Sequence, residues 1–87
     1  IIYCEASSNY TNFYFTNRGL ICASKPVHEY ETVLEDAGFI RIHKSHLVNK
    51  NHVINYNSEG QLVMIDQSKV EISRRRKDEV MEALKGN

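Results

Sequence analysis

Short apolar runs separated by polar turns fill the first quarter of the chain. "IIYCEA" (1–6) and "FYF" (13–15) are rich in residues that favour β-strands, and "LICA" (20–23) follows a turn signal at "NRG" (17–19). The segment "SNYTN" (8–12) is polar and is predicted to form an exposed loop between the first two runs. This part of the chain is therefore expected to form two or three strands joined by tight turns.

The hydrophobic period changes after Ser24. Apolar residues now recur at helical spacing, at Val27, Tyr30, Leu34 and Ala37. Pro26 is typical of a first helical turn, and Gly38 is typical of the position that follows the last one. The pattern therefore predicts a helix between Pro26 and Gly38.

Strand-like runs return after this helix. They are "FIRI" (39–42), "HVINY" (52–56), "QLVMI" (61–65) and "KVEIS" (69–73), with turn signals at "NSEG" (57–60) and "DQS" (66–68). Ser73 is then predicted to cap a second helix, in which Val80, Met81 and Leu84 form one apolar face and which Gly86 ends. The whole pattern predicts a mostly β domain with one or two short helices.

Composition supports a single globular domain over residues 1–87. The 87 residues are 41% hydrophobic and 25% charged, which suffices for one small core and rarely for two. The longest apolar runs, such as "LVMI" (62–65), are far shorter than the roughly 20 residues needed to cross a bilayer, so a soluble protein with no membrane partner is expected. The chain opens without a methionine, and we expect it to be a piece excised from a longer protein.

Both cysteines lie in strand-like apolar runs. Cys4 and Cys22 are therefore expected to be reduced residues of the core, with a disulfide between them as the alternative.

Charge is balanced overall but unevenly distributed. The formal net charge is +0, which argues against a protein that binds polyanions by bulk attraction alone. From Arg41 to Lys77 there are eight basic and three acidic residues, whereas Glu29 to Asp36 holds four acids and no base. The molecule is polarised along its sequence.

Two basic clusters stand at strand ends. The alternation of "FIRIHKSH" fails after Ile42, so the strand is predicted to end there and "HKSH" (43–46) to form a loop that offers a cation, a hydroxyl and two imidazoles. "SRRRK" (73–77) offers similar donors, and arginine can fork onto guanine or phosphate. The clusters are about thirty residues apart, and we expect that they can share one edge of a small β domain.

Each of these residues has a structural alternative. Arg41 can pair with an acid on a neighbouring strand, and His43 can be a half-buried histidine that donates to a backbone carbonyl. Residues 74–77 can be a solvated first helical turn, although cations at a helix N-terminus oppose its dipole. Asn49 is interpreted as a structural residue whose side chain bridges loop backbone.

Catalytic and metal-binding patterns are weak. His43, His46, His52 and Cys4 are a conceivable zinc set, but residues three apart on an extended chain face opposite ways and no CxxC or HxxxH pair exists. Ser45 has no nearby carboxylate and no glycine-rich oxyanion turn. We therefore expect no metal, no cofactor and no enzymatic activity.

Three segments resemble a known family. "IIYCEASSNYT", "FIRIHKSHLVN" and "VEISRRR" closely resemble the LytTR DNA-binding domain, the output module of many bacterial response regulators. The resemblance covers nearly the whole chain, and the central segment is its most specific part. Domains of this family usually carry another strand before the first segment, so one edge strand is expected to be missing here.

The resemblance implies an elongated, mostly β fold whose loops enter successive major grooves of a DNA direct repeat. It implies base-reading roles for Lys44, Arg75 and Asn9, where the family usually has arginine or asparagine at the position of Lys44. The residues that it assigns to the DNA backbone are Arg41, His43, Ser45, Arg74 and Arg76.

The resemblance also implies a wider setting. It predicts a transcription-regulating output domain in the cytoplasm, downstream of a receiver domain, with dimerisation on DNA. Two other classes stay open from the residues themselves, an RNA or single-strand binder and a protein-interaction module that uses open sheet edges. Against the former, Tyr3 and Tyr10 are interpreted as core or rim residues, and the sequence suggests no paired aromatic residues on adjacent strands.

Overall fold

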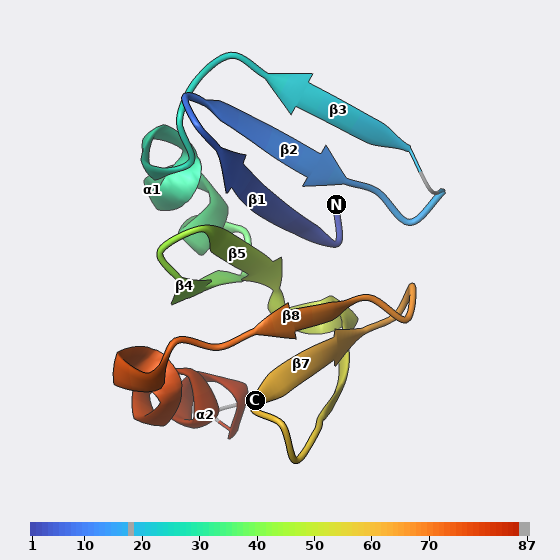
Figure 1. Cartoon of the computed structure of the whole chain (residues 1–87), viewed down its shortest axis with the longest axis vertical. Helices are drawn as coiled ribbons and strands as arrows, with labels where there is room; N and C mark the ends of the chain where they lie inside the picture. Colours follow the sequence, from blue (N-terminus) through green and yellow to red (C-terminus); the bar gives the residue numbers. More distant parts are fainter. Residues whose placement is uncertain (18, 86–87) are drawn as a thin grey trace.

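Two antiparallel sheets and two short helices form the computed structural model, which describes residues 1–17 and 19–85 (Figure 1). The larger sheet has the order β3-β2-β1-β5-β4, with β1 (Tyr3–Ser7), β2 (Tyr10–Tyr14), β3 (Leu20–Ala23), β4 (Phe39–His43) and β5 (His46–Asn49). The smaller sheet has the order β6-β7-β8, with β6 (Val53–Tyr56), β7 (Gln61–Met64) and β8 (Lys69–Glu71). The helical segments are α1 (His28–Asp36), η1 (Lys50–His52), η2 (Arg74–Arg76) and α2 (Lys77–Lys85). The predicted mostly β fold with two short helices is confirmed.

The β1–β2 hairpin is tighter than the sequence suggested. Residues 10–12 belong to β2, and only Ser8 and Asn9 remain in the turn. Thr11 is fully buried opposite Ala6, and its hydroxyl donates to the carbonyl of Lys25 at 2.7 Å. Because that bond satisfies the buried hydroxyl, a polar residue can occupy a core position of the strand.

The β4–β5 hairpin also differs from the prediction. β4 continues through His43, β5 begins at His46, and the turn consists of Lys44 and Ser45 alone. A bulge between Arg41 and His43 shifts the register, which explains why the alternation fails after Ile42. β5 was not predicted from the sequence, yet it pairs with both β1 and β4 inside the larger sheet.

The first helix occupies the predicted segment. α1 begins after the buried Val27 and ends before Gly38, whose φ of +92° suits a residue without a Cβ. The helix covers one face of the larger sheet, where Val27 packs with Cys4, Phe39 and Leu47.

The second helix begins later than predicted. The turn η2 separates Ser73 from α2, and the Ser73 side chain makes no capping bond; its buried Oγ has no hydrogen-bond partner among the residues that the structure describes. Val80 is buried and Met81 and Leu84 are half-buried, as expected for the predicted apolar face of this helix. The predicted end at Gly86 lies outside the described residues.

One core joins the two sheets and α2. Its buried side chains are Ile2, Ile42, Val48, Leu62, Met64, Val70, Ile72 and Val80. Each such burial contributes roughly 1.5–3 kcal/mol to the folded state. The principal extents are 32 × 25 × 23 Å, so the molecule is only slightly elongated.

The cysteines occupy different environments. Cys4 is buried, as predicted, but Cys22 is exposed on β3, so its assignment to the core is wrong. β3 forms an edge of the larger sheet, and three of its four residues are exposed. Both thiols are free. Within residues 1–17 and 19–85, no helix is long and apolar enough to cross a membrane.

Candidate nucleic-acid interface

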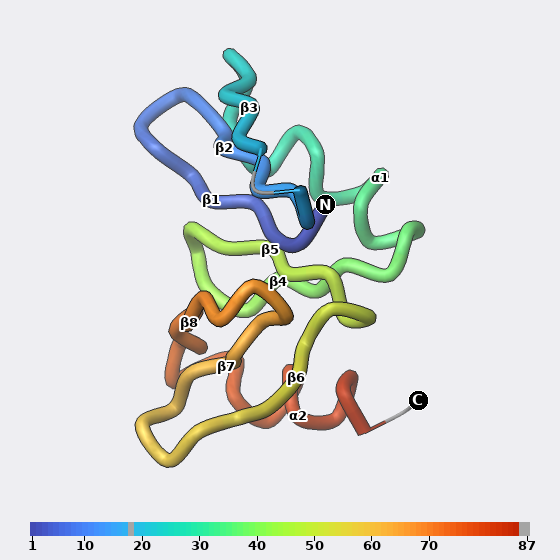
Figure 2. Tube along the Cα trace, turned by 90° about the vertical axis from the view of Figure 1, so that its right-hand side faces the viewer, coloured from blue at the N-terminus to red at the C-terminus, as the bar shows by residue number. Residues whose placement is uncertain are grey.

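Three turns that are distant in sequence lie along one side of the molecule. They are the β1–β2 turn with Asn9, the β4–β5 turn with Lys44, and η2, which is Arg74–Arg76 (Figures 1 and 2). Asn9, Lys44, Arg74 and Arg75 all have exposed side chains. The structure therefore places all three predicted base-reading residues on the same side.

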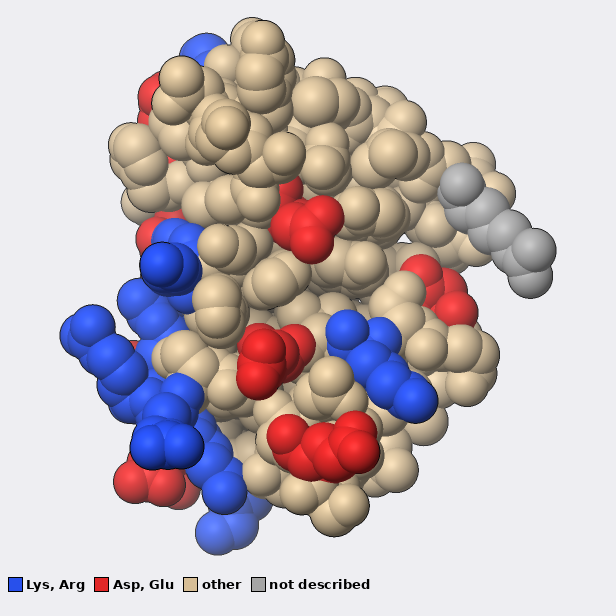
Figure 3. Space-filling view, in the orientation of Figure 1, with Lys and Arg blue, Asp and Glu red and all other residues tan. Residues whose placement is uncertain are grey.

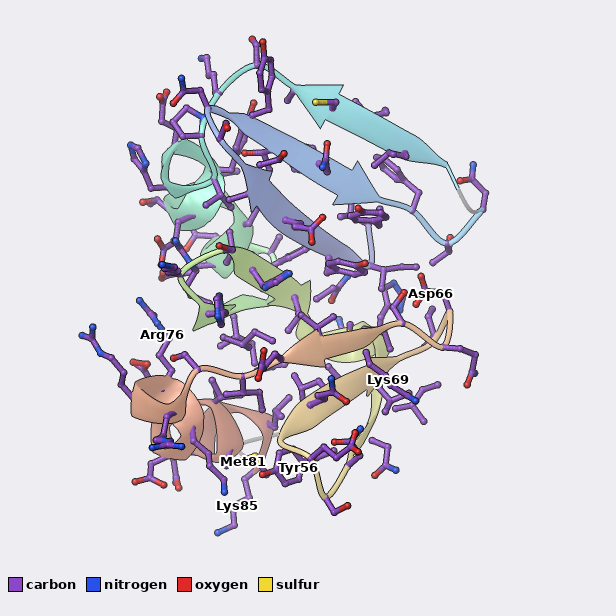
Figure 4. The ribbon with its side chains drawn as sticks, in the orientation of Figure 1. Tyr56, Asp66, Lys69, Arg76, Met81 and Lys85 are labelled. Carbon is purple, nitrogen blue, oxygen red and sulfur yellow. The ribbon has the colours of Figure 1, made fainter. Side chains whose placement is uncertain are left out.

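Positive charge is concentrated on this side. Figure 3 shows Lys and Arg side chains gathered along the left of the view, over the start of α2 and toward the β4–β5 turn, whereas the upper sheet presents few charges. We call the exposed cations of these elements the basic surface: Lys44, Arg74, Arg75 and Lys77. Lys69 lies on the opposite side with Asp66 (Figure 4), so one of the cations counted in the sequence does not belong to it. A neutral chain can thus carry a locally positive surface.

Arg41 holds the backbone of the β4–β5 turn. Its Nε donates to the carbonyl of His43 at 2.8 Å, and a terminal nitrogen donates to the carbonyl of Lys44. The other terminal nitrogen donates to Oε1 of Glu31 at 2.6 Å, and the Arg41 side chain is only 14% exposed. These bonds use three of the five N–H groups of the guanidinium, so they favour a structural role for Arg41, and the expected phosphate contact stays a prediction. The alternative of an acid pair is found, but the acid lies on α1 and not on a neighbouring strand.

His43 also has a structural bond. Its Nδ1 accepts a hydrogen bond from the backbone amide of Ser45 at 3.1 Å, so the imidazole closes the turn as an acceptor rather than as the expected donor to a carbonyl. The ring lies edge-on to His46, with 5.4 Å between the ring centroids. The Nε2 atom of His43 is left for an outside partner when Nδ1 is occupied in this way.

His46 is half-buried. Burial lowers the pKa of His46, and this effect outweighs Glu5, whose Oε2 lies 3.4 Å from Nε2 and favours the charged form. Glu5 also accepts a hydrogen bond from the hydroxyl of Tyr14 at 3.0 Å. We therefore interpret His46 as a neutral residue that supports the hairpin.

A hollow of about 490 Å³ lies between the end of β4 at His43, the β6–β7 hairpin and the segment from β8 to the start of α2. Cations and acids share its lining, with Arg74 and Lys77 among the cations and Glu59 and Glu71 among the acids. Lys77 Nζ lies 5.9 Å from the centroid of the Tyr56 ring, a distance that permits a cation–π interaction. The hollow is thus a polar groove within the basic surface rather than a closed ligand pocket.

Arg76 differs from its neighbours. It is half-buried and lines a second hollow between α1, β4 and α2. Three acids line the same hollow: Glu31, Glu35 and Glu79. Arg76 lies on the same side of the molecule as the basic surface (Figure 4). The acids around it make the predicted phosphate contact weaker.

Other predicted residues have clear positions. Asn49 accepts from the amide of Asn51 at 3.1 Å and donates to the carbonyl of Ile1 at 2.9 Å, so its structural role is confirmed. Tyr10 is 51% exposed at the rim of its hairpin. The described part of the chain holds no group of three or more histidine, cysteine or acidic side chains suited to a metal ion.

Sequence reasoning missed one aromatic pair. Tyr3 and Tyr14 stand opposite each other on β1 and β2, with ring centroids 4.5 Å apart and planes 15° apart. The expectation that no aromatic residues pair on adjacent strands was wrong. The two rings stack on each other, however, and Tyr14 is hydrogen-bonded to Glu5. A carboxylate at this position disfavours the approach of a nucleotide, whose phosphate is also negative.

Comparisons with known proteins agree on one family. A family model described as the LytTr DNA-binding domain matches residues 1–85. The chain is 36% identical over 55 residues to a sensory transduction protein LytR from Staphylococcus saprophyticus; the match covers 59% of this chain and 22% of that protein. A solved LytTr DNA-binding domain from Bacillus cereus, described as part of a methyl-accepting/DNA response regulator, superposes with a TM-score of 0.82 at 24% identity, covering 97% of this chain and 80% of that one. The chain thus has the same fold, and its match spans about a fifth of the length of the curated relative.

Proposed function

We propose that this chain, which belongs to the LytTr DNA-binding domain family, reads duplex DNA with its basic surface and the neighbouring β1–β2 turn. The observation that carries the proposal is the placement of Lys44. It projects from a two-residue turn in which Arg41 binds the carbonyl of Lys44 and that of the preceding His43, on the side where Arg74 and Arg75 are exposed. A short turn fixed in this way is suited to enter a major groove about 12 Å wide.

We propose different roles for the residues of this interface. Lys44, Arg75 and Asn9 are proposed to contact base edges, since each is exposed on one of the three turns. Arg74, His43 and Ser45 are proposed to contact the DNA backbone, with the Nε2 atom of His43 as the donor. Arg76 is proposed as a weaker backbone contact because acids surround it, and Arg41 as a residue that positions the turn.

The wider setting is also a proposal. The relative named as a sensory transduction protein is much longer than this chain, which supports a transcription-regulating output domain that follows a receiver domain in a two-component response regulator. Binding to a direct repeat would place two copies in the same orientation, and any contact between them would join two different surfaces.

The proposal is tested by fluorescence anisotropy with the 87-residue chain. The probes are a duplex that the chain enriches from a randomised library, a scrambled duplex of equal length, and one strand of the enriched duplex. We expect tightest binding to the enriched duplex and, for about five neutralised phosphates, a log–log salt slope near −4.5. Equal affinity for both duplexes, preference for the single strand, or a flat salt response would contradict the proposal.

A further inference from the structure

We propose that Glu31, an acid on α1, positions the DNA-reading turn through Arg41 and thereby contributes to sequence discrimination. The inference rests on the proposed function, because it assumes that Lys44 reads DNA. It gives an acidic residue a role in DNA recognition that its charge alone would oppose.

The Arg41 guanidinium joins three segments. It donates to Glu31 on α1 at 2.6 Å, to the carbonyl of His43 at 2.8 Å, and to the carbonyl of Lys44. Because the guanidinium is rigid and planar, the direction of one bond fixes the direction of the others. The ion pair with α1 therefore decides whether the carbonyls of His43 and Lys44 have a donor.

Without Glu31 the guanidinium would have other acids to approach. Glu35 and Glu79 line the same hollow as Arg41, and neither is hydrogen-bonded to it. A cation whose side chain is only 14% exposed strongly favours a carboxylate partner. Removing Glu31 should turn Arg41 toward one of these acids, away from the carbonyls of His43 and Lys44. The turn would then lose the bonds that fix its backbone.

The sign of the effect separates positioning from charge. Removing an acid beside a DNA surface should by charge alone strengthen binding, and it should do so for every duplex sequence. A positioning role predicts weaker binding to the enriched duplex only. Glu35 is the matched control, since it lies one helical turn after Glu31 and lines the same hollow without a hydrogen bond to Arg41.

The experiment compares Glu31→Ala with Glu35→Ala on the enriched and scrambled duplexes. We expect Glu31→Ala to weaken binding to the enriched duplex about three- to tenfold and not to weaken binding to the scrambled duplex. This loss is a part of the roughly 5- to 150-fold discrimination that a complete base contact provides. Glu35→Ala should leave both affinities unchanged or slightly tighter. Glu31→Gln, which retains an acceptor oxygen, should lose less than Glu31→Ala. Equal effects of the two alanine variants would overturn the inference.

A double-mutant cycle tests the path through Lys44. In a Lys44→Ala background, Glu31→Ala should no longer weaken binding to the enriched duplex, because the contact that it positions is already absent. A full additional loss in that background would show that Glu31 acts by another route and would contradict the proposal. Thermal unfolding of each variant identifies any loss that comes from a less stable domain.

A measurement without DNA keeps the inference separate from the proposed function. Hydrogen exchange of the Ser45 amide, which donates to His43 within the turn, should accelerate in Glu31→Ala and not in Glu35→Ala. If the wild-type chain fails to discriminate between duplexes, the proposed function fails, while this exchange rate still tests the link between Glu31 and the turn. Unchanged exchange in Glu31→Ala would overturn that link.

Discussion

The backbone amide of Ser73 donates to the carbonyl of Ile42 at 2.8 Å. This bond joins the residue before η2 to the strand that leads into the β4–β5 turn. Two basic segments about thirty residues apart in sequence therefore leave the core side by side. Their proximity depends on the pairing of backbone and not on attraction between their side chains, because the Lys and Arg residues of both segments carry the same sign of charge.

Substitutions of Lys44 should change which sequence is preferred. Lys44→Arg replaces a single-point donor with a fork that can bind guanine through two bonds. We expect the variant to enrich a different base at one position of the selected duplex, and Lys44→Ala to lose preference there. Selection from a randomised library followed by sequencing measures this outcome. An unchanged selected sequence in both variants would show that Lys44 does not read a base.

Arg74 and Arg76 should differ as contacts to the DNA backbone. Arg74 is exposed, so Arg74→Ala should weaken binding to enriched and scrambled duplexes together and reduce the salt slope by about one. Arg76 is half-buried among acids, so Arg76→Ala should change the slope less. Affinities at several salt concentrations measure both effects. A larger change for Arg76 would contradict the assignment.

Acidification should destabilise the folded chain through His46. Burial lowers the pKa of His46 below its ordinary 6.5, so the unfolded state binds a proton more readily than the folded state. The free energy of unfolding should therefore be highest above about pH 6.5 and fall as the pH drops from there toward the lowered pKa.

Urea unfolding at several pH values tests this dependence. His46→Gln should flatten the pH dependence, whereas His28→Gln, which changes an exposed residue of α1, should preserve it. A stability that rises on acidification would mean that the pair with Glu5 outweighs burial.

The two cysteines should react differently. Burial raises the pKa of the Cys4 thiol to about 12, which disfavours the reactive thiolate, whereas Cys22 is exposed on β3. Near pH 8 a thiol reagent should modify one cysteine in the native chain and two in urea. Cys22→Ser should abolish the native reaction. Modification of the native Cys22→Ser variant would show that β1 opens readily.

Local chemistry explains which features could be predicted from the sequence. The helical spacing from Val27 and the conformational freedom of Gly38 act within a few residues, so the bounds of α1 follow from the sequence. The basic clusters could be recognised because their residue types are suited to phosphate and base edges. The sequence could only suggest that the two clusters lie on one side of the molecule, because that placement depends on the long-range bond between Ser73 and Ile42.

Features that depend on tertiary contacts were missed. Thr11 is polar, and its burial depends on the carbonyl of Lys25 fourteen positions away. β5 is only four residues long, and its pairing on both sides compensates for a weak local signal. The partner of Arg41 was sought on a strand, but packing of α1 against β4 brings Glu31 to it.

We propose that the basic surface reads sequence and does more than attract phosphate. The dissociation constants of Arg75→Ala on the enriched and scrambled duplexes distinguish these two roles, with equal melting temperatures as the control. We expect a loss of about 1–3 kcal/mol on the enriched duplex and nearly unchanged binding to the scrambled one, because a bidentate contact to guanine discriminates by that amount. Equal losses on both duplexes would instead make Arg75 a contact to the DNA backbone, and sequence reading by this residue would be wrong.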